Sequence, residues 1–93
     1  MMTNREILAH NGYDPDFYVL FENPSFDGAV VGVSTDDRVI YDYDLMIEAA
    51  LRENPDWTIE DTIDWIEYNT IRSLSYVPDS PIIQYKLFTE DEV

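Results

Sequence analysis

The fold is decided by residues 29–42, which read AVVGVSTDDRVIYD. Two runs rich in Val, Ile and Tyr flank the polar segment Thr35–Asp37, and such runs on either side of a short turn are typical of a β-hairpin. The stretch therefore predicts two antiparallel strands, at 29–34 and 38–42. Gly32 lies inside the first strand, where a glycine often marks a bulge or a close packing neighbour.

Helices are expected on both sides of this hairpin. Each candidate begins with residues that accept hydrogen bonds from the free N–H groups of a first helical turn, and two of the three starts have capping-box spacing. The predicted helices cover residues 4–11, about 45–53, and 59–71, with the capping residues Thr3 and Glu6, Asp42 or Asp44, and Thr58 and Asp61, respectively.

Two further strands complete the predicted order. Phe17–Phe21 is short, aromatic and β-branched, and Pro81–Leu87 has its proline at the start, where no ladder donor is lost. The resulting order is α-β-β-β-α-α-β, which predicts an α+β fold: a small, mainly antiparallel sheet of three or four strands with helices on one face. A chain of 93 residues fits one domain, so we expect a single acidic domain over residues 1–93.

The chain is strongly acidic, with 20 Asp and Glu residues against five Lys and Arg and a net charge of −15. Because 45% of its residues are hydrophobic, it is expected to fold and to hold this charge on a fixed surface, unlike a disordered acidic tail. Such a surface repels nucleic acid and anionic membranes and attracts basic proteins. A partner rich in Lys and Arg is therefore expected. Solubility alone is the competing explanation for the acidity.

Features of catalysis, metal binding and secretion are sparse. The chain has no Cys, no pattern of a signal peptide and no apolar run near the roughly 20 residues that span a bilayer, so a cytoplasmic location is expected. The only imidazole, His10, is expected to have a surface or capping role. Acidic pairs such as Asp42 and Asp44 do not follow EF-hand spacing, so we expect no metal ion and no cofactor. The chain is not expected to be an enzyme.

The most distinctive arrangement lies on the helix predicted at 59–71. Glu60, Asp64 and Glu67 recur at spacings of four and three residues and so form one outward row, with Asp61 alongside. Carboxylates one helical turn apart have a separation comparable to that of neighbouring backbone phosphates. The row therefore predicts a binding face for a protein that grips DNA or RNA through Lys and Arg, and a plain solvated helix face is the alternative.

Aromatic side chains flank this row. Trp65 and Tyr68 belong to the core if they pack inward. If they are exposed, they can anchor an Arg-rich partner through contact area and cation–π attraction. The candidate protein-binding residues are Glu60, Asp61, Asp64, Trp65, Glu67 and Tyr68.

Two segments resemble a known group of proteins. Gly32–Arg38 with Tyr41–Asp44, followed by Trp65–Arg72, are similar to short acidic proteins encoded by gut Firmicutes and their mobile elements, over about two-thirds of the chain. That group supplies no established activity, so the resemblance transfers no site residues. Its mobile-element setting implies an inhibitor of host defence that imitates nucleic acid.

The sequence thus leads to a non-catalytic interaction domain that binds a basic protein surface through its acidic helix face. The first alternative is a small structural or accessory module, with a homodimer as one form of it, in which acidity serves only solubility. The second is a small hydrolase that uses two carboxylates in a deep cleft. A confined acidic stripe favours the binding role, whereas acids spread evenly over the surface favour the solubility role.

Overall fold

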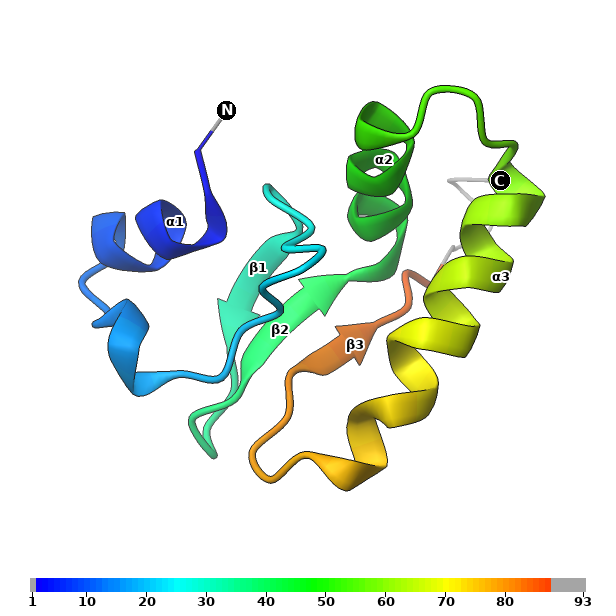
Figure 1. Ribbon diagram of the computed structural model, residues 1–93. Helices are drawn as coiled ribbons and strands as arrows, with labels where there is room; N and C mark the ends of the chain where they lie inside the picture. Colours follow the sequence, from blue (N-terminus) through cyan, green and yellow to red (C-terminus); the bar gives the residue numbers. More distant parts are fainter. Residues whose placement is uncertain (1, 88–93) are drawn as a thin grey trace.

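A computed structural model describes residues 2–87 and shows an α+β fold with a small three-stranded sheet, which confirms the predicted class (Figure 1). The elements in chain order are α1 (Asn4–His10), the 3₁₀ helix η1 (Pro15–Phe17), β1 (Val30–Val33), β2 (Val39–Asp42), α2 (Tyr43–Glu53), α3 (Ile59–Asn69), the 3₁₀ helix η2 (Ile71–Tyr76) and β3 (Ile82–Gln84).

The predicted hairpin is present as β1 and β2. These strands pair antiparallel, with Val30 opposite Tyr41 and Val33 opposite Val39. The register shifts between Val30 and Gly32, so β1 contains an irregularity at the glycine that predicted one. A side chain at Gly32 would meet the side chain of Ile40 at 3.7 Å, which is ordinary contact, so crowding does not explain this glycine.

The third strand joins the hairpin from the far end of the described chain. β3 pairs parallel with the free edge of β2, and Tyr41 lies opposite Ile83. The sheet is therefore mixed, with one antiparallel and one parallel pairing, and not mainly antiparallel as predicted. A parallel pairing requires a long crossover, and α2, α3 and η2 together provide it.

The prediction of a strand at Phe17–Phe21 is wrong. Asp14 accepts the backbone N–H of Asp16 and starts the short helix η1, and the segment after it pairs with no strand among the described residues. The backbone N–H of Phe21 is instead donated to the hydroxyl of Tyr41 at 3.1 Å, and the two rings lie 4.7 Å apart. The aromatic residues that predicted a strand thus serve packing against the sheet.

The predicted helix starts at Asn4 and Ile59 are confirmed, and α2 begins at Tyr43, slightly earlier than predicted. Thr3 with Glu6 and Thr58 with Asp61 each form a complete capping box, and Asp42, not Asp44, caps α2. The end of the third helix differs from the prediction, because α3 stops at Asn69 and η2 follows. The hydroxyl of Ser73 donates to the backbone carbonyl of Thr70 at 2.9 Å, a local bond that competes with helix continuation.

The core lies between the sheet and its helices. Along β2, the buried Val39 and Tyr41 alternate with the half-buried Ile40 and Asp42. The buried cluster joins Val39 and Tyr41 to side chains of all three α-helices, namely Leu8, Met46, Ala49, Ala50 and Ile66. The helices therefore contribute to the core on the face of β2 that carries Tyr41, and this packing fixes the direction of α3.

Candidate functional site

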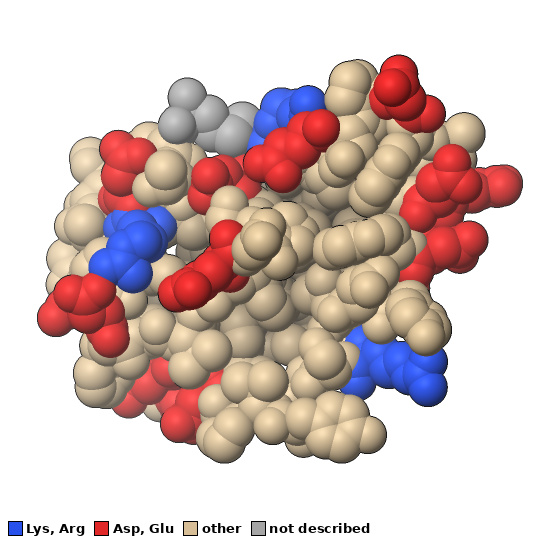
Figure 2. Space-filling view, viewed as in Figure 1, with Lys and Arg blue, Asp and Glu red and all other residues tan. Residues whose placement is uncertain are grey.

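The acidic row consists of Glu60, Asp64 and Glu67, which all lie on α3 and are all exposed. Thr62 and Ile66 on the same helix are buried, so the core holds one side of α3 and the row faces solvent. Figure 2 shows acidic side chains gathered at the right edge of the molecule, over α3 as it lies in Figure 1. The structure thus brings the three predicted carboxylates onto one accessible helix face.

Asp61 has a different role from the row. Its carboxylate accepts the backbone N–H of Thr58 at 3.3 Å, and its own N–H is donated to the Thr58 hydroxyl at 3.0 Å. These bonds fix the first turn of α3, and the negative charge at this helix terminus is favourable. We therefore assign Asp61 to positioning the helix that carries the row.

Glu67 is linked to a neighbouring helix. The hydroxyl of Tyr43, at the start of α2, donates to Oε1 of Glu67 at 3.0 Å. Burial, and then the bond to Glu67 and its charge, raise the pKa of Tyr43 to about 12. The ring of Tyr43 also lies 4.9 Å from that of Tyr85. Glu67 is thus held at the end of the row by a bond that the sequence did not predict.

The two predicted aromatic anchors behave differently. Trp65 is half-buried, packs against the core and lies 6.0 Å from the ring of Trp57, which fits the expectation of an inward-facing core residue. Tyr68 is 68% exposed, so its ring is accessible beside Glu67. Tyr68 is therefore the aromatic group available for contact with a partner.

The guanidinium group of Arg72 lies over the ring of Tyr68. Its guanidinium carbon lies 5.2 Å from the ring centroid, within the range of a cation–π contact. Sequence analysis missed this residue, although its spacing of four from Tyr68 is the spacing at which side chains meet on a helix. The contact shows that Tyr68 can accept an arginine from within the chain.

Acidic side chains are not confined to α3. Figure 2 shows them at several further places on the visible face, together with basic groups. Two of the basic residues form ion pairs away from the row, Arg5 with Asp16 and Arg38 with Asp36, the latter at 3.7 Å. The charge on this face is therefore a set of patches, of which the row on α3 is one.

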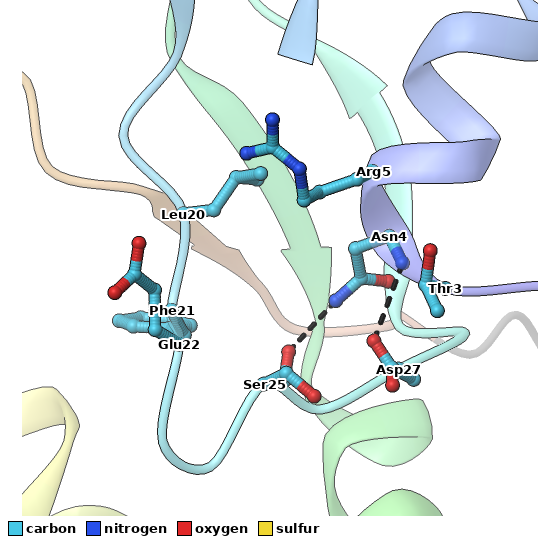
Figure 3. A pocket seen from close by; sticks show the side chains of 8 residues that line it. All are labelled: Thr3, Asn4, Arg5, Leu20, Phe21, Glu22, Ser25 and Asp27. Carbon is cyan, nitrogen blue, oxygen red and sulfur yellow. Dashed lines mark hydrogen bonds between the residues drawn. The ribbon is translucent and has the colours of Figure 1, made fainter. Parts of the chain in front are cut away.

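A concave site lies between α1 and the loop that precedes β1. It is a cavity of about 320 Å³, and Figure 3 shows its lining residues. Asn4 closes one wall by donating its side-chain amide to the carbonyls of Ser25 at 2.7 Å and Phe26 at 3.0 Å. Two acidic residues, Glu22 and Asp27, line the cavity with Arg5.

These two carboxylates differ in their surroundings. Asp27 is half-buried and accepts the backbone N–H of Asn4 at 3.3 Å, whereas Glu22 is exposed to solvent. His10 is also exposed, at the last turn of α1.

Within residues 2–87 no group of three or more His, Asp and Glu side chains is placed to hold a metal ion. None of the helices in the same part of the chain has the length and apolar character needed to cross a membrane.

Comparison of the chain with protein-family models, with curated proteins and with solved structures finds no match.

Proposed function

We propose that the chain is a non-catalytic acidic interaction domain that binds a basic protein surface through α3. Glu60, Asp64 and Glu67 supply the charge, Tyr68 supplies the aromatic contact, and Asp61 and Trp65 hold the helix in place. The observation that carries this proposal is the exposed row next to an exposed Tyr68 that already holds an arginine at 5.2 Å.

The charge around the row supports this assignment. From Glu53 to Ile71 the sequence contains no Lys or Arg, so the helix itself carries no compensating cation. Like charges one turn apart weaken a helix by roughly a few tenths of a kcal/mol per pair. A Lys- or Arg-rich partner would relieve this repulsion on binding.

We further propose that the row imitates the phosphates of nucleic acid and that the chain thereby blocks a host-defence protein in the cytoplasm. The spacing of the carboxylates supports the imitation. The resemblance to acidic proteins of mobile elements supports the choice of target.

The test measures binding of deca-arginine to the full chain by fluorescence anisotropy in 50 mM NaCl. The variant Asp64→Lys with Glu67→Lys is expected to weaken binding at least tenfold, because it replaces attraction by repulsion at the row. The matched control is Glu22→Lys with Glu48→Lys, which alters net charge equally at two exposed acids outside the row.

The control separates position from total charge. If it weakens binding as much as the α3 variant does, the acids act only through net charge. That outcome would support the alternative of an accessory module whose acidity serves solubility, which the several acidic patches in Figure 2 favour. A target protein with a basic nucleic-acid groove is the next probe if the row passes this test.

A further inference from the structure

A second cavity lies where α2 meets α3. It has a volume of about 310 Å³, and its walls come from the last turn of α2, the loop that joins the two helices (Figure 1), α3 and the loop that precedes β1. Binding sites for small molecules begin at about this size. The cavity shares no lining residue with the cavity beside α1 and contains none of the three carboxylates of the row. Neither site described above therefore accounts for it.

Two indole rings form the aromatic part of the wall. Trp57 in the loop and Trp65 on α3 both line the cavity, and their ring centroids lie 6.0 Å apart with the ring planes tilted by 41°. Each side chain is only half-buried, so each ring keeps accessible surface. The face of an indole carries partial negative charge, so two such rings attract a cation.

The neighbouring part of the wall is negative as well. Ala50, Glu53 and Asn54 form the C-terminal end of α2, and all three line the cavity. A helix dipole is negative at this end and favours a bound cation, and the carboxylate of Glu53 adds a full charge. No Lys or Arg is among the described residues that line the cavity. The guanidinium group of the adjacent Arg52 donates to the backbone carbonyl of Asp27 at 2.9 Å.

Local hydrogen bonds hold these walls in place. The backbone N–H of Trp57 donates to the carbonyl of Asn54 at 3.0 Å, which closes the turn between the helices. The side-chain amide of Asn54 donates to the carbonyl of Ala50, also at 3.0 Å. Trp65 packs against the core from α3. The cavity is therefore formed before a ligand arrives, which lowers the entropic cost of binding.

The chemistry of the walls selects the ligand. A neutral apolar molecule would contact the rings but would gain nothing from Glu53 or from the end of α2. A lysine ammonium group is compact and strongly hydrated, so indole rings replace its water poorly. A quaternary ammonium group carries its charge inside a shell of alkyl groups, so it suits the rings and the carboxylate together.

We propose that this cavity binds a quaternary ammonium group, with Trp57 and Trp65 against its methyl groups and Glu53 as the opposing charge. The net charge of −15 favours the approach of such a cation from solution. The proposal adds a site for a small organic cation to the macromolecular contact assigned to α3.

The experiment titrates the full chain with choline chloride at constant ionic strength and records tryptophan fluorescence. Because the chain has two tryptophans and both line the cavity, the emission reports on this site alone. We expect a saturable change. The neutral compound 3,3-dimethylbutan-1-ol has the shape of choline without its charge and should bind at least fivefold more weakly. Equal affinity for the two compounds, or no saturable change up to 50 mM choline, would overturn the proposal.

A second arm identifies the source of the ammonium group. The same titration uses a short peptide that contains one trimethyllysine, with the unmodified peptide as its control. Binding of the trimethylated peptide more tightly than choline assigns the ligand to a modified protein. Binding of choline more tightly assigns it to a free small molecule.

Two variants place the site. Trp57→Leu keeps an apolar side chain but removes the ring, and Glu53→Gln keeps the shape but removes the charge. Each should raise the dissociation constant of choline at least threefold, with Trp65 as the remaining reporter in the first. The control is Glu48→Gln, which removes the same charge from an exposed residue of α2 that does not line the cavity. Far-UV circular dichroism checks that each variant is folded.

An unchanged affinity in Trp57→Leu, or equal weakening by Glu48→Gln and Glu53→Gln, would overturn the assigned site. The outcome is independent of the binding role of α3. Deca-arginine binding without choline binding refutes only the cavity, and choline binding without deca-arginine binding refutes only the role of the row.

Discussion

α3 and η2 follow one another along the chain, yet their surfaces differ in charge. α3 exposes a row of carboxylates, whereas the segment from Tyr68 to Leu87, which contains η2 and β3, exposes tyrosines and aliphatic side chains and has one acidic residue, Asp79. The boundary lies inside α3, between Glu67 and Tyr68. Net charge alone therefore describes this protein poorly, because 16 of its 20 acidic residues precede Tyr68.

Alkaline pH is expected to have the largest effect, because the fold opposes ionisation of the buried Tyr41 and of Tyr43, which contacts the row on α3. Burial raises the pKa of Tyr41 to about 12, and burial with Glu67 raises the pKa of Tyr43 to about 12. The pKa in an unfolded chain is about 10. The stabilisation is therefore complete below pH 10 and is lost as the pH rises to 12. For Tyr41 alone the loss is about 3 kcal/mol.

Urea unfolding at pH 9 and pH 11.5 measures this loss. Tyr43→Phe removes one of the two high-pKa groups, so the variant should lose less stability over this range than the parent chain. Equal stability at the two pH values would show that neither hydroxyl is held as the structure indicates.

Salt should weaken binding at the row on α3. Between 50 and 500 mM NaCl the affinity of α3 for deca-arginine should fall about tenfold, because screening weakens attraction between opposite charges. An unchanged affinity over this range would show that the charges of the row do not contribute to binding.

The two helices also differ in how they begin. Thr58 caps α3 through its side chain, whereas no side chain caps η2. Thr58→Ala should lower the free energy of unfolding by about 1 kcal/mol, read by urea titration. Thr35→Ala, an exposed hydroxyl in the hairpin turn, is the control and should have little effect.

Arg72 lies at the boundary and offers the smallest and sharpest test. Arg72→Gln should free the ring of Tyr68 and tighten deca-arginine binding about two- to fivefold, since an exposed cation–π contact contributes roughly 0.5–1 kcal/mol. Arg5→Gln removes the same charge from a residue paired with Asp16. A matching gain from Arg5→Gln would assign the effect to net charge.

Local patterns predicted the parts of the fold that local bonds build. The hairpin and the caps at Thr3 and Thr58 follow from residues within a few positions of one another, and the row on α3 follows from helical spacing alone. The strand expected at Phe17–Phe21 failed because its partner is a hydroxyl on Tyr41, twenty residues away. No local signal could have revealed that bond.

The site was predictable to a similar extent. Spacing placed Glu60, Asp64 and Glu67 on one face, and it also contained the contact between Tyr68 and Arg72, which we did not infer. The bond from Tyr43 to Glu67 joins residues 24 positions apart on two packed helices, so it depends on the tertiary arrangement.

The parallel pairing of β3 with β2 has a consequence for synthesis on the ribosome. Residues 39–42 emerge early and form the hairpin with β1, but their second edge stays open until residues 82–84 have been translated. During that interval an unpaired strand edge is available to other nascent chains. The carboxylates of α2 and α3 emerge in the meantime, and their mutual repulsion would keep neighbouring chains apart on a polysome.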